Sequence, residues 1–253
     1  MLAAGCLVGF VAAERQARSP LVDFGLFRAR GFTLGIVAGL LSYAVLFGSL
    51  FLVPFYLERV LDRSAQQTGL LLAPVPIALG LLAPLAGGVT DRIGARLPTI
   101  AGMLVSTVAL LVLAAISVRI LPLTVAELAL LGVGLGLFTP PNNSEVMGSA
   151  PPGQLGVAGG VLNMTRSIGT SFGVAATGAV LTGLLAVQAG HAVARTQDAP
   201  PAALRAAFHE SLVFLAALAL LAALVSMARC ATCSEQPGTA AAREAAMSEG
   251  SGL

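Results

Sequence analysis

Long runs with few or no charged residues are the feature that most constrains the fold of this chain. A helix needs about 20 apolar residues to cross the hydrocarbon core of a bilayer, which is about 30 Å thick. Six runs in the sequence meet or approach that length, each bounded by charged or polar residues. The six predicted transmembrane helices are 31–57, 64–90, 97–118, 121–143, 154–187 and 211–228. We therefore predict an all-α integral membrane protein.

The composition excludes several other classes of protein. Hydrophobic residues make up 57% of the 253 and charged residues 10%, against about 25% charged in a soluble domain. The net charge of +2 is too small and too dispersed for a nucleic-acid surface. Cys230 and Cys233 form a C-x-x-C pair, but no second pair or histidine follows to complete the four ligands that zinc needs. We expect no nucleic-acid partner, no metal and no cofactor.

Two terminal segments fall outside the six predicted helices. Residues 1–13 are apolar but too short to cross a bilayer, and no positive charge precedes them as in a signal peptide. We interpret them as a truncated transmembrane helix, so that the chain begins inside a longer protein. Residues 14–30 form a polar linker, and the tail 230–253, rich in Ala, Ser, Glu and Gly, is predicted to be disordered.

The positions of the arginines predict an orientation. Short cytoplasmic loops carry an excess of Lys and Arg, and one side of the predicted bundle carries eight arginines against five on the other. We expect a multi-pass protein of the inner (plasma) membrane. The linker 14–30, the loop 91–96 and the C-terminus are then expected to lie in the cytoplasm. The loops 58–63 and 188–209 then face outward.

The loop after the second predicted helix reads GGVTDRIGAR, and its residues have separate physical uses. The glycines permit close helix approach and a tight turn. The acid supplies an anion that can dock on the start of a facing helix, expected at 153–156, while the arginines hold the loop at an anionic surface. The predicted gating residues are Gly87, Asp91, Arg92, Gly94 and Arg96.

Polar and helix-distorting residues inside the predicted helices mark a candidate translocation path. Pro140 and Pro141 lack an N–H and are expected to break the fourth helix, freeing carbonyls that need protein or a water-filled cavity nearby. The candidate path residues are Tyr43, Pro140, Pro141, Asn142, Asn143, Asn163 and Arg166.

Two charged residues lie inside the predicted helices. Arg166 is about a dozen residues into the fifth helix, where a charge is costly, so we expect it to face the interior and find a partner near the proline break. The alternative is that Arg166 extends to the cytoplasmic interface and only anchors the helix. Glu127 is close enough to the start of the fourth helix for its carboxylate to reach the headgroup region.

Glycines at helical spacing predict close packing between helices. Small residues four apart let membrane helix backbones approach closely enough for dispersion to hold them together. Two such pairs lie in the fifth helix, which is therefore expected to be central. The pairs are Gly156 with Gly160 and Gly169 with Gly173. Three glycines between 132 and 136 are interpreted in the same way, since no strand precedes them as in a dinucleotide-binding loop.

Several of these stretches resemble the major facilitator superfamily. The spacing G-x-x-x-D-R-x-G-x-R from Gly87 to Arg96 is similar to its signature loop. Segments 130–152 and 156–181 look like the twelfth and thirteenth helices of its fourteen-helix drug:proton antiporter branch, and 14–35 looks like the link from the eighth helix to the ninth. The resemblance implies the C-terminal half of a multidrug efflux transporter, with two three-helix repeats within 31–229.

The resemblance also implies a function. Such a transporter is a secondary active exporter of amphipathic small molecules, driven by protons through alternating access. Its partners are the lipid bilayer, the small-molecule substrate, protons and an N-terminal half, on this polypeptide or another. One alternative is an inactive fragment or a membrane scaffold without transport. A membrane enzyme is less favoured, because the sequence shows no cluster of acids or histidines suited to catalysis.

Overall fold

The computed structural model describes residues 29–116, 121–151, 153–188 and 201–233. Within these ranges the chain is helical and has no strand. The helices are α2 (Arg30–Val60), α3 (Ala65–Leu72), α4 (Pro74–Ile93), α5 (Arg96–Ile116), α6 (Leu121–Gly148), α7 (Leu155–Gln188) and α8 (Pro201–Cys233). They supply six segments long and apolar enough to span a membrane, with α3 and α4 forming one of them. The predicted all-α class with six spans is confirmed, while the predicted truncated helix 1–13 and most of the linker and tail lie outside the described residues.

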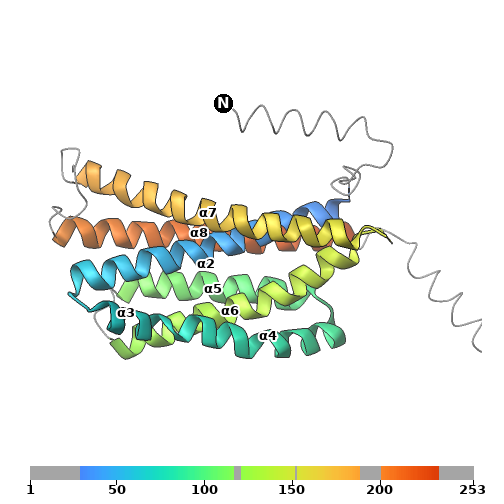
Figure 1. Cartoon of the computed structure of the whole chain (residues 1–253), viewed down its shortest axis with the longest axis horizontal. Coiled ribbons are helices and arrows are strands. Elements are labelled where there is room, and N and C mark those ends of the chain that lie inside the picture. The colour runs from blue at the N-terminus through green and yellow to red at the C-terminus, as the bar shows by residue number, and fades with distance from the viewer. Residues whose placement is uncertain (1–28, 117–120, 152, 189–200, 234–253) are drawn as a thin grey trace, which may run out of the picture.

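The helices run side by side in one bundle (Figure 1). We call the end at which α2 and α7 begin and α6 and α8 finish the Arg229 end, and the other the Glu127 end. Successive spans alternate in direction, so the α4–α5 turn also lies at the Arg229 end. Helix α2 packs on α7 and α8, whereas α6 packs on α4 and α5. As a result α7 and α4 lie on opposite sides of the bundle (Figure 1).

Two helices extend further than the sequence predicted. Helix α6 continues to Gly148 rather than stopping at 143, and α8 begins at Pro201 rather than at 211. The first turns of α8 carry Arg205, His209 and Glu210. An uncharged run predicts only the part of a helix that lies in the hydrocarbon core of the membrane. The same helix can continue beyond that core with polar turns, which the predicted boundaries left out.

Prolines interrupt a different span from the one predicted. The expected break at Pro140 and Pro141 is wrong, because α6 passes through both residues without interruption. The break occurs instead at Ala73, before Pro74 and Pro76, which remove two backbone N–H donors from the helix. Packing accounts for the difference: half of the spanning window of α6 is buried, against 22% for α3 and α4. Neighbouring helices hold α6 in shape, and α3–α4 has little such support.

Glycines bring α6 into backbone contact with a helix on either side. A Cβ atom added at Gly132 would lie under 3.0 Å from the Val75 carbonyl of α4. One added at Gly134 would lie 2.5 Å from the Gly102 carbonyl of α5. These positions admit no side chain, so the glycines between 132 and 136 serve helix packing.

The two glycine pairs of α7 have different surroundings. A Cβ at Gly169 would lie 2.7 Å from the Leu40 carbonyl of α2, and one at Gly173 would meet the backbone of Ala44 at 2.6 Å. At Gly156 and Gly160 a Cβ would meet no atom within 4 Å among the residues described. Only the second pair therefore makes a helix contact within this chain, and α7 is a peripheral helix rather than a central one.

This difference gives a stability test within one helix. Gly173→Ala is expected to destabilise the bundle by about 1–3 kcal/mol, because the added methyl group must push α2 and α7 apart. Gly160→Ala is the matched control, since its methyl group enters open space. Thermal unfolding of the purified chain in detergent measures both. Equal midpoints for the two variants would contradict the packing described here.

Candidate functional site

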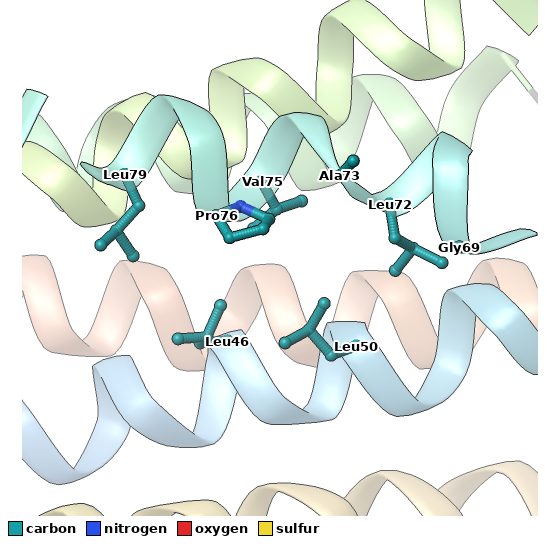
Figure 2. Close-up of a pocket in the computed structure, with 8 residues that line it drawn as sticks. All are labelled: Leu46, Leu50, Gly69, Leu72, Ala73, Val75, Pro76 and Leu79. Carbon is teal, nitrogen blue, oxygen red and sulfur yellow. The ribbon is translucent and has the colours of Figure 1, made fainter. Parts of the chain in front are cut away.

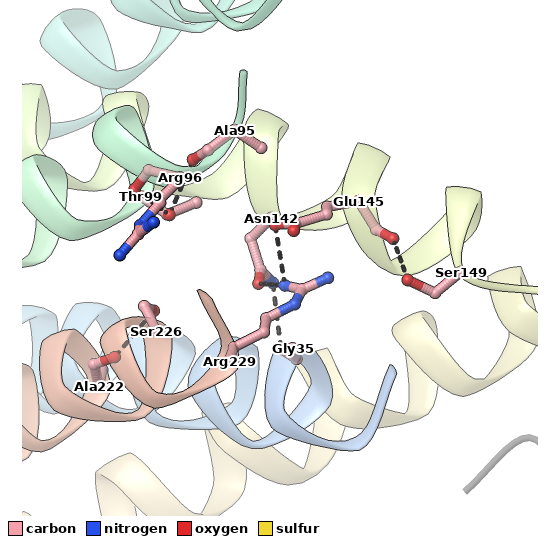
Figure 3. A network of polar contacts seen from close by, with 10 residues as sticks. All are labelled: Gly35, Ala95, Arg96, Thr99, Asn142, Glu145, Ser149, Ala222, Ser226 and Arg229. Carbon is pink, nitrogen blue, oxygen red and sulfur yellow. Dashed lines mark hydrogen bonds and ion pairs between the residues drawn. The ribbon is translucent and has the colours of Figure 1, made fainter. Parts of the chain in front are cut away.

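A buried guanidinium ties three helices together at the Arg229 end. Arg229 of α8 is only 3% exposed. Its Nη1 donates a hydrogen bond of 3.1 Å to Asn142 Oδ1 and lies 3.3 Å from Glu145 Oε2, both on α6. The Asn142 amide in turn donates from Nδ2 to the Gly35 carbonyl of α2, at 3.2 Å (Figure 3). We call these four residues the Arg229 cluster.

The local sequence makes this cluster possible. Asn142 and Glu145 are three residues apart, so a continuous α6 places both on one face. Gly35 leaves room for the guanidinium, since a Cβ at that position would lie 2.6 Å from Arg229 Nη1. Had α6 ended at the prolines, neither polar side chain would hold this position.

The cluster replaces the partnership expected for Arg166. Asn142 pairs instead with Arg229, one of the eight arginines on the side predicted to be cytoplasmic. Arg166 is exposed, and its guanidinium makes no hydrogen bond or ion pair with the described residues. The expectation failed because it placed Arg166 on a central helix. The sequence offers only a partial signal: Asn142 and Glu145 share a helix face and can both accept from a cation, but nothing in it identifies Arg229 as that cation.

Polar side chains follow one exposed face of α7. Asn163, Arg166, Ser167 and Ser171 are exposed and Thr170 is half-buried; we call them the α7 polar face. The Ser167 hydroxyl donates to the Asn163 carbonyl at 3.1 Å, and that of Thr170 to the Arg166 carbonyl at 2.8 Å. These hydroxyls are satisfied by their own helix, whereas the Asn163 amide and the Arg166 guanidinium have no partner in the described part of the chain.

The remaining path residues are divided between two places. Tyr43 is half-buried at the contact of α2 with α7, where its Cβ lies close to Gly169. Pro141 is buried in α6, and Pro140 and Asn143 are half-buried beside it. The structure therefore does not gather the predicted path residues into one patch.

The signature loop lies at the Arg229 end without contacts to α7. Gly94 has a φ of 82°, in the left-handed region that favours glycine, and its N–H bonds to the Thr90 carbonyl at 2.8 Å. Asp91, Arg92 and Arg96 are exposed. Asp91 does not dock on 153–156, because α4 and α7 occupy opposite sides of the bundle (Figure 1). A Cβ at Gly87 would also meet no atom within 4 Å.

An apolar groove lies between α2 and the broken helix α3–α4 (Figure 2). Its volume is about 280 Å³. Leu46 and Leu50 of α2 face Leu72, Pro76 and Leu79 across it (Figure 2). It is also lined by Gly69, Ala73 and Val75. With no polar side chain in its walls, the groove suits a hydrocarbon or aromatic group rather than an ion.

Glu127 is a second buried ionisable side chain, near the other end of α6. It is 4% exposed, so the expectation that its carboxylate reaches the headgroup region is wrong. Neighbouring helices cover the face of α6 that carries Glu127, although Leu121 and Ala126 in the same turns are exposed. Among the described residues, no three His, Cys, Asp or Glu side chains gather as a metal site would require.

Comparisons with known proteins show what the chain is similar to. The sequence profile of the Major Facilitator Superfamily matches residues 8–174. Multidrug resistance protein Stp of Mycobacterium tuberculosis is 33% identical over 183 residues, which cover 72% of this chain and 34% of Stp. The uncharacterized transporter YebQ of Escherichia coli is 33% identical over 86% of this chain and 44% of its own length. Riboflavin transporter RibZ of Clostridioides difficile is 33% identical over 63% of this chain and 36% of its own. The chain thus spans less than half the length of these relatives.

The Arg229 cluster predicts unequal effects of removing two arginines. Arg229→Ala should lower the free energy of unfolding by about 1–3 kcal/mol, because it leaves the buried Asn142 oxygen without a donor. Arg166→Ala, the control, removes an exposed side chain with no described partner and should leave stability unchanged. Thermal unfolding of the purified chain compares them, and a loss of stability in Arg166→Ala as large as in Arg229→Ala would refute the assignment.

Proposed function

Since this chain belongs to the major facilitator superfamily, we propose that it forms the C-terminal six-helix half of a proton-driven exporter of amphipathic small molecules. The names of the relatives support transport of small molecules, and that of Stp supports multidrug resistance. The apolar groove between α2 and α3–α4 suits the apolar part of such a substrate. The observation that carries the proposal is the α7 polar face.

A polar face in a membrane-spanning helix needs polar surroundings. An arginine at the centre of a membrane helix is unfavourable by about 2.5–3.5 kcal/mol when it faces lipid. Only 22% of the spanning window of α7 is buried within this chain, and Asn163 and Arg166 lie on its exposed side. The α7 polar face therefore borders water or another protein segment. Transporters of this superfamily place the substrate between two six-helix halves near the middle of the membrane, and an aqueous path there would meet this need.

Within such a transporter the two clusters have different roles. The Arg229 cluster connects α2, α6 and α8 inside the half, so these helices move as one unit during alternating access. The exposed signature loop, with Asp91 and Arg92, is left free to contact the second half and to bias the access equilibrium. We place the Arg229 end in the cytoplasm, since it carries this arginine-containing loop.

Transport by the complete two-half protein tests the role of Arg166. Arg166→Gln and Arg166→Lys should both lower the rate at which proteoliposomes take up ethidium, an amphipathic cation, with insertion into the membrane retained. The glutamine variant loses the charge, while the lysine variant loses the planar donors of the guanidinium. Arg59→Gln, at the exposed end of α2, is the control. Wild-type rates in both Arg166 variants would make Arg166 an anchor and remove the main support for the path.

A further inference from the structure

Glu127 carries an unusual combination of position and surroundings. It follows Leu121, the first residue of α6, by six positions, which is about 9 Å along the helix axis. Its Oε1 atom is buried and has no hydrogen-bond partner. It is the one buried carboxyl group in the part of the chain that the structure describes. Buried ionisable groups in membrane helices are retained for function more often than for stability.

The face of α6 that carries Glu127 is turned toward α5. Glu127 lies two helical turns before Gly134, on the same face, and Gly134 is in backbone contact with α5. Because α5 and α6 run in opposite directions, the same level of α5 is occupied by Ala109, Leu110 and Leu113. All three are buried and apolar. On the side turned toward α5, the carboxyl group therefore meets hydrocarbon rather than hydrogen-bond donors.

The helices that pack on α6 bring few ionisable groups near Glu127. Helix α3 has none, and those of α4 and α5 lie at the Arg229 end; Arg166 is the one in α7, on its exposed side. Tyr56 of α2 is buried but stacks on Phe208 of α8, with ring centroids 3.9 Å apart. The other ionisable side chains described at the Glu127 end are exposed. They are Glu58, Arg59, Asp62, Arg63, Arg205, His209 and Glu210.

We infer that Glu127 is a proton-binding site, which the transporter uses to couple export to the proton gradient; this inference rests on the proposed function. An ionised carboxylate without a partner is strongly disfavoured in apolar surroundings, so in the conformation described here the group holds its proton. Release breaks the carboxyl O–H bond and passes the proton to water. It therefore requires a second conformation in which water reaches Oε1.

The neighbouring segment α3 offers a route for that water. Helix α3 contacts α6, and its Thr68 hydroxyl is 3% exposed and has no hydrogen-bond partner in the described residues. The break at Ala73 separates α3 from α4, so α3 can shift without carrying the whole span. A displacement of α3 from α6 would give both unsatisfied groups access to water. A sodium ion fits less well, because it needs several oxygen ligands at once.

Infrared spectroscopy of the purified 253-residue chain tests the proton directly. The C=O stretch of a buried, protonated carboxyl group should be present at neutral pH in the wild type and absent in Glu127→Gln. Glu127→Asp keeps a carboxyl group and should keep the band, which controls for misfolding. Glu145→Gln, which removes the ion-paired acid, should also keep it. A wild-type spectrum without the band, or a band that survives in Glu127→Gln, overturns the inference.

A transport measurement tests the coupling. In proteoliposomes with the complete two-half protein, Glu127→Gln should lose ethidium uptake driven by a pH gradient. The same variant should retain movement of ethidium down its own concentration gradient. Uptake in this variant equal to wild type, or wild-type uptake driven by a sodium gradient instead, overturns the inference. If wild type moves ethidium in neither mode while the infrared band behaves as expected, the proposed function fails and the proton site stands.

Discussion

The hydrocarbon of the bilayer forms no hydrogen bonds, and this constraint explains most of the structure. Each polar group inside the membrane must find a partner in the protein or face water. Most buried Ser and Thr hydroxyls meet the requirement locally, as when Ser106 donates to the Gly102 carbonyl one turn earlier at 3.0 Å. The larger groups cannot do so. Arg229 Nη1 finds its partners on another helix, Arg166 has none in the described residues, and Glu127 is neutral only while it holds a proton.

These three side chains divide the described helices into a tightly connected inner part and two exposed outer spans. Glycines hold α6 against α4 and α5, and the Arg229 cluster joins α6 to α2 and α8. This network leaves little freedom among the inner helices. The lightly buried spans, α3–α4 and α7, lie on opposite sides and carry the signature loop and the α7 polar face. In the proposed two-half transporter, we expect contacts with the second half to form on these two spans.

The sequence predicted the number of spans and the helical class, because length and hydropathy directly reflect the solvent. It was less informative about partners. The pairing of Asn142 with Arg229 joins residues 87 positions apart, and no pattern within one helix reveals it. The prolines are also hard to interpret from sequence alone. Each proline removes one backbone N–H donor, yet a helix is interrupted at Pro74 and Pro76 and not at Pro140 and Pro141. Packing by neighbouring helices determines which prolines interrupt a helix, and the local sequence does not reveal that packing.

The α7 polar face is proposed to border water inside the membrane, and the water accessibility of α7 tests this most directly. Single cysteines at 163, 167 and 171, in the complete two-half protein freed of its native cysteines, should react with a membrane-impermeant thiol reagent. Cysteines in place of the exposed apolar Met164, Ile168 and Phe172, on the adjoining side of α7, should not react. Equal reactivity along both sides, or none at 163, 167 and 171, would contradict the claim.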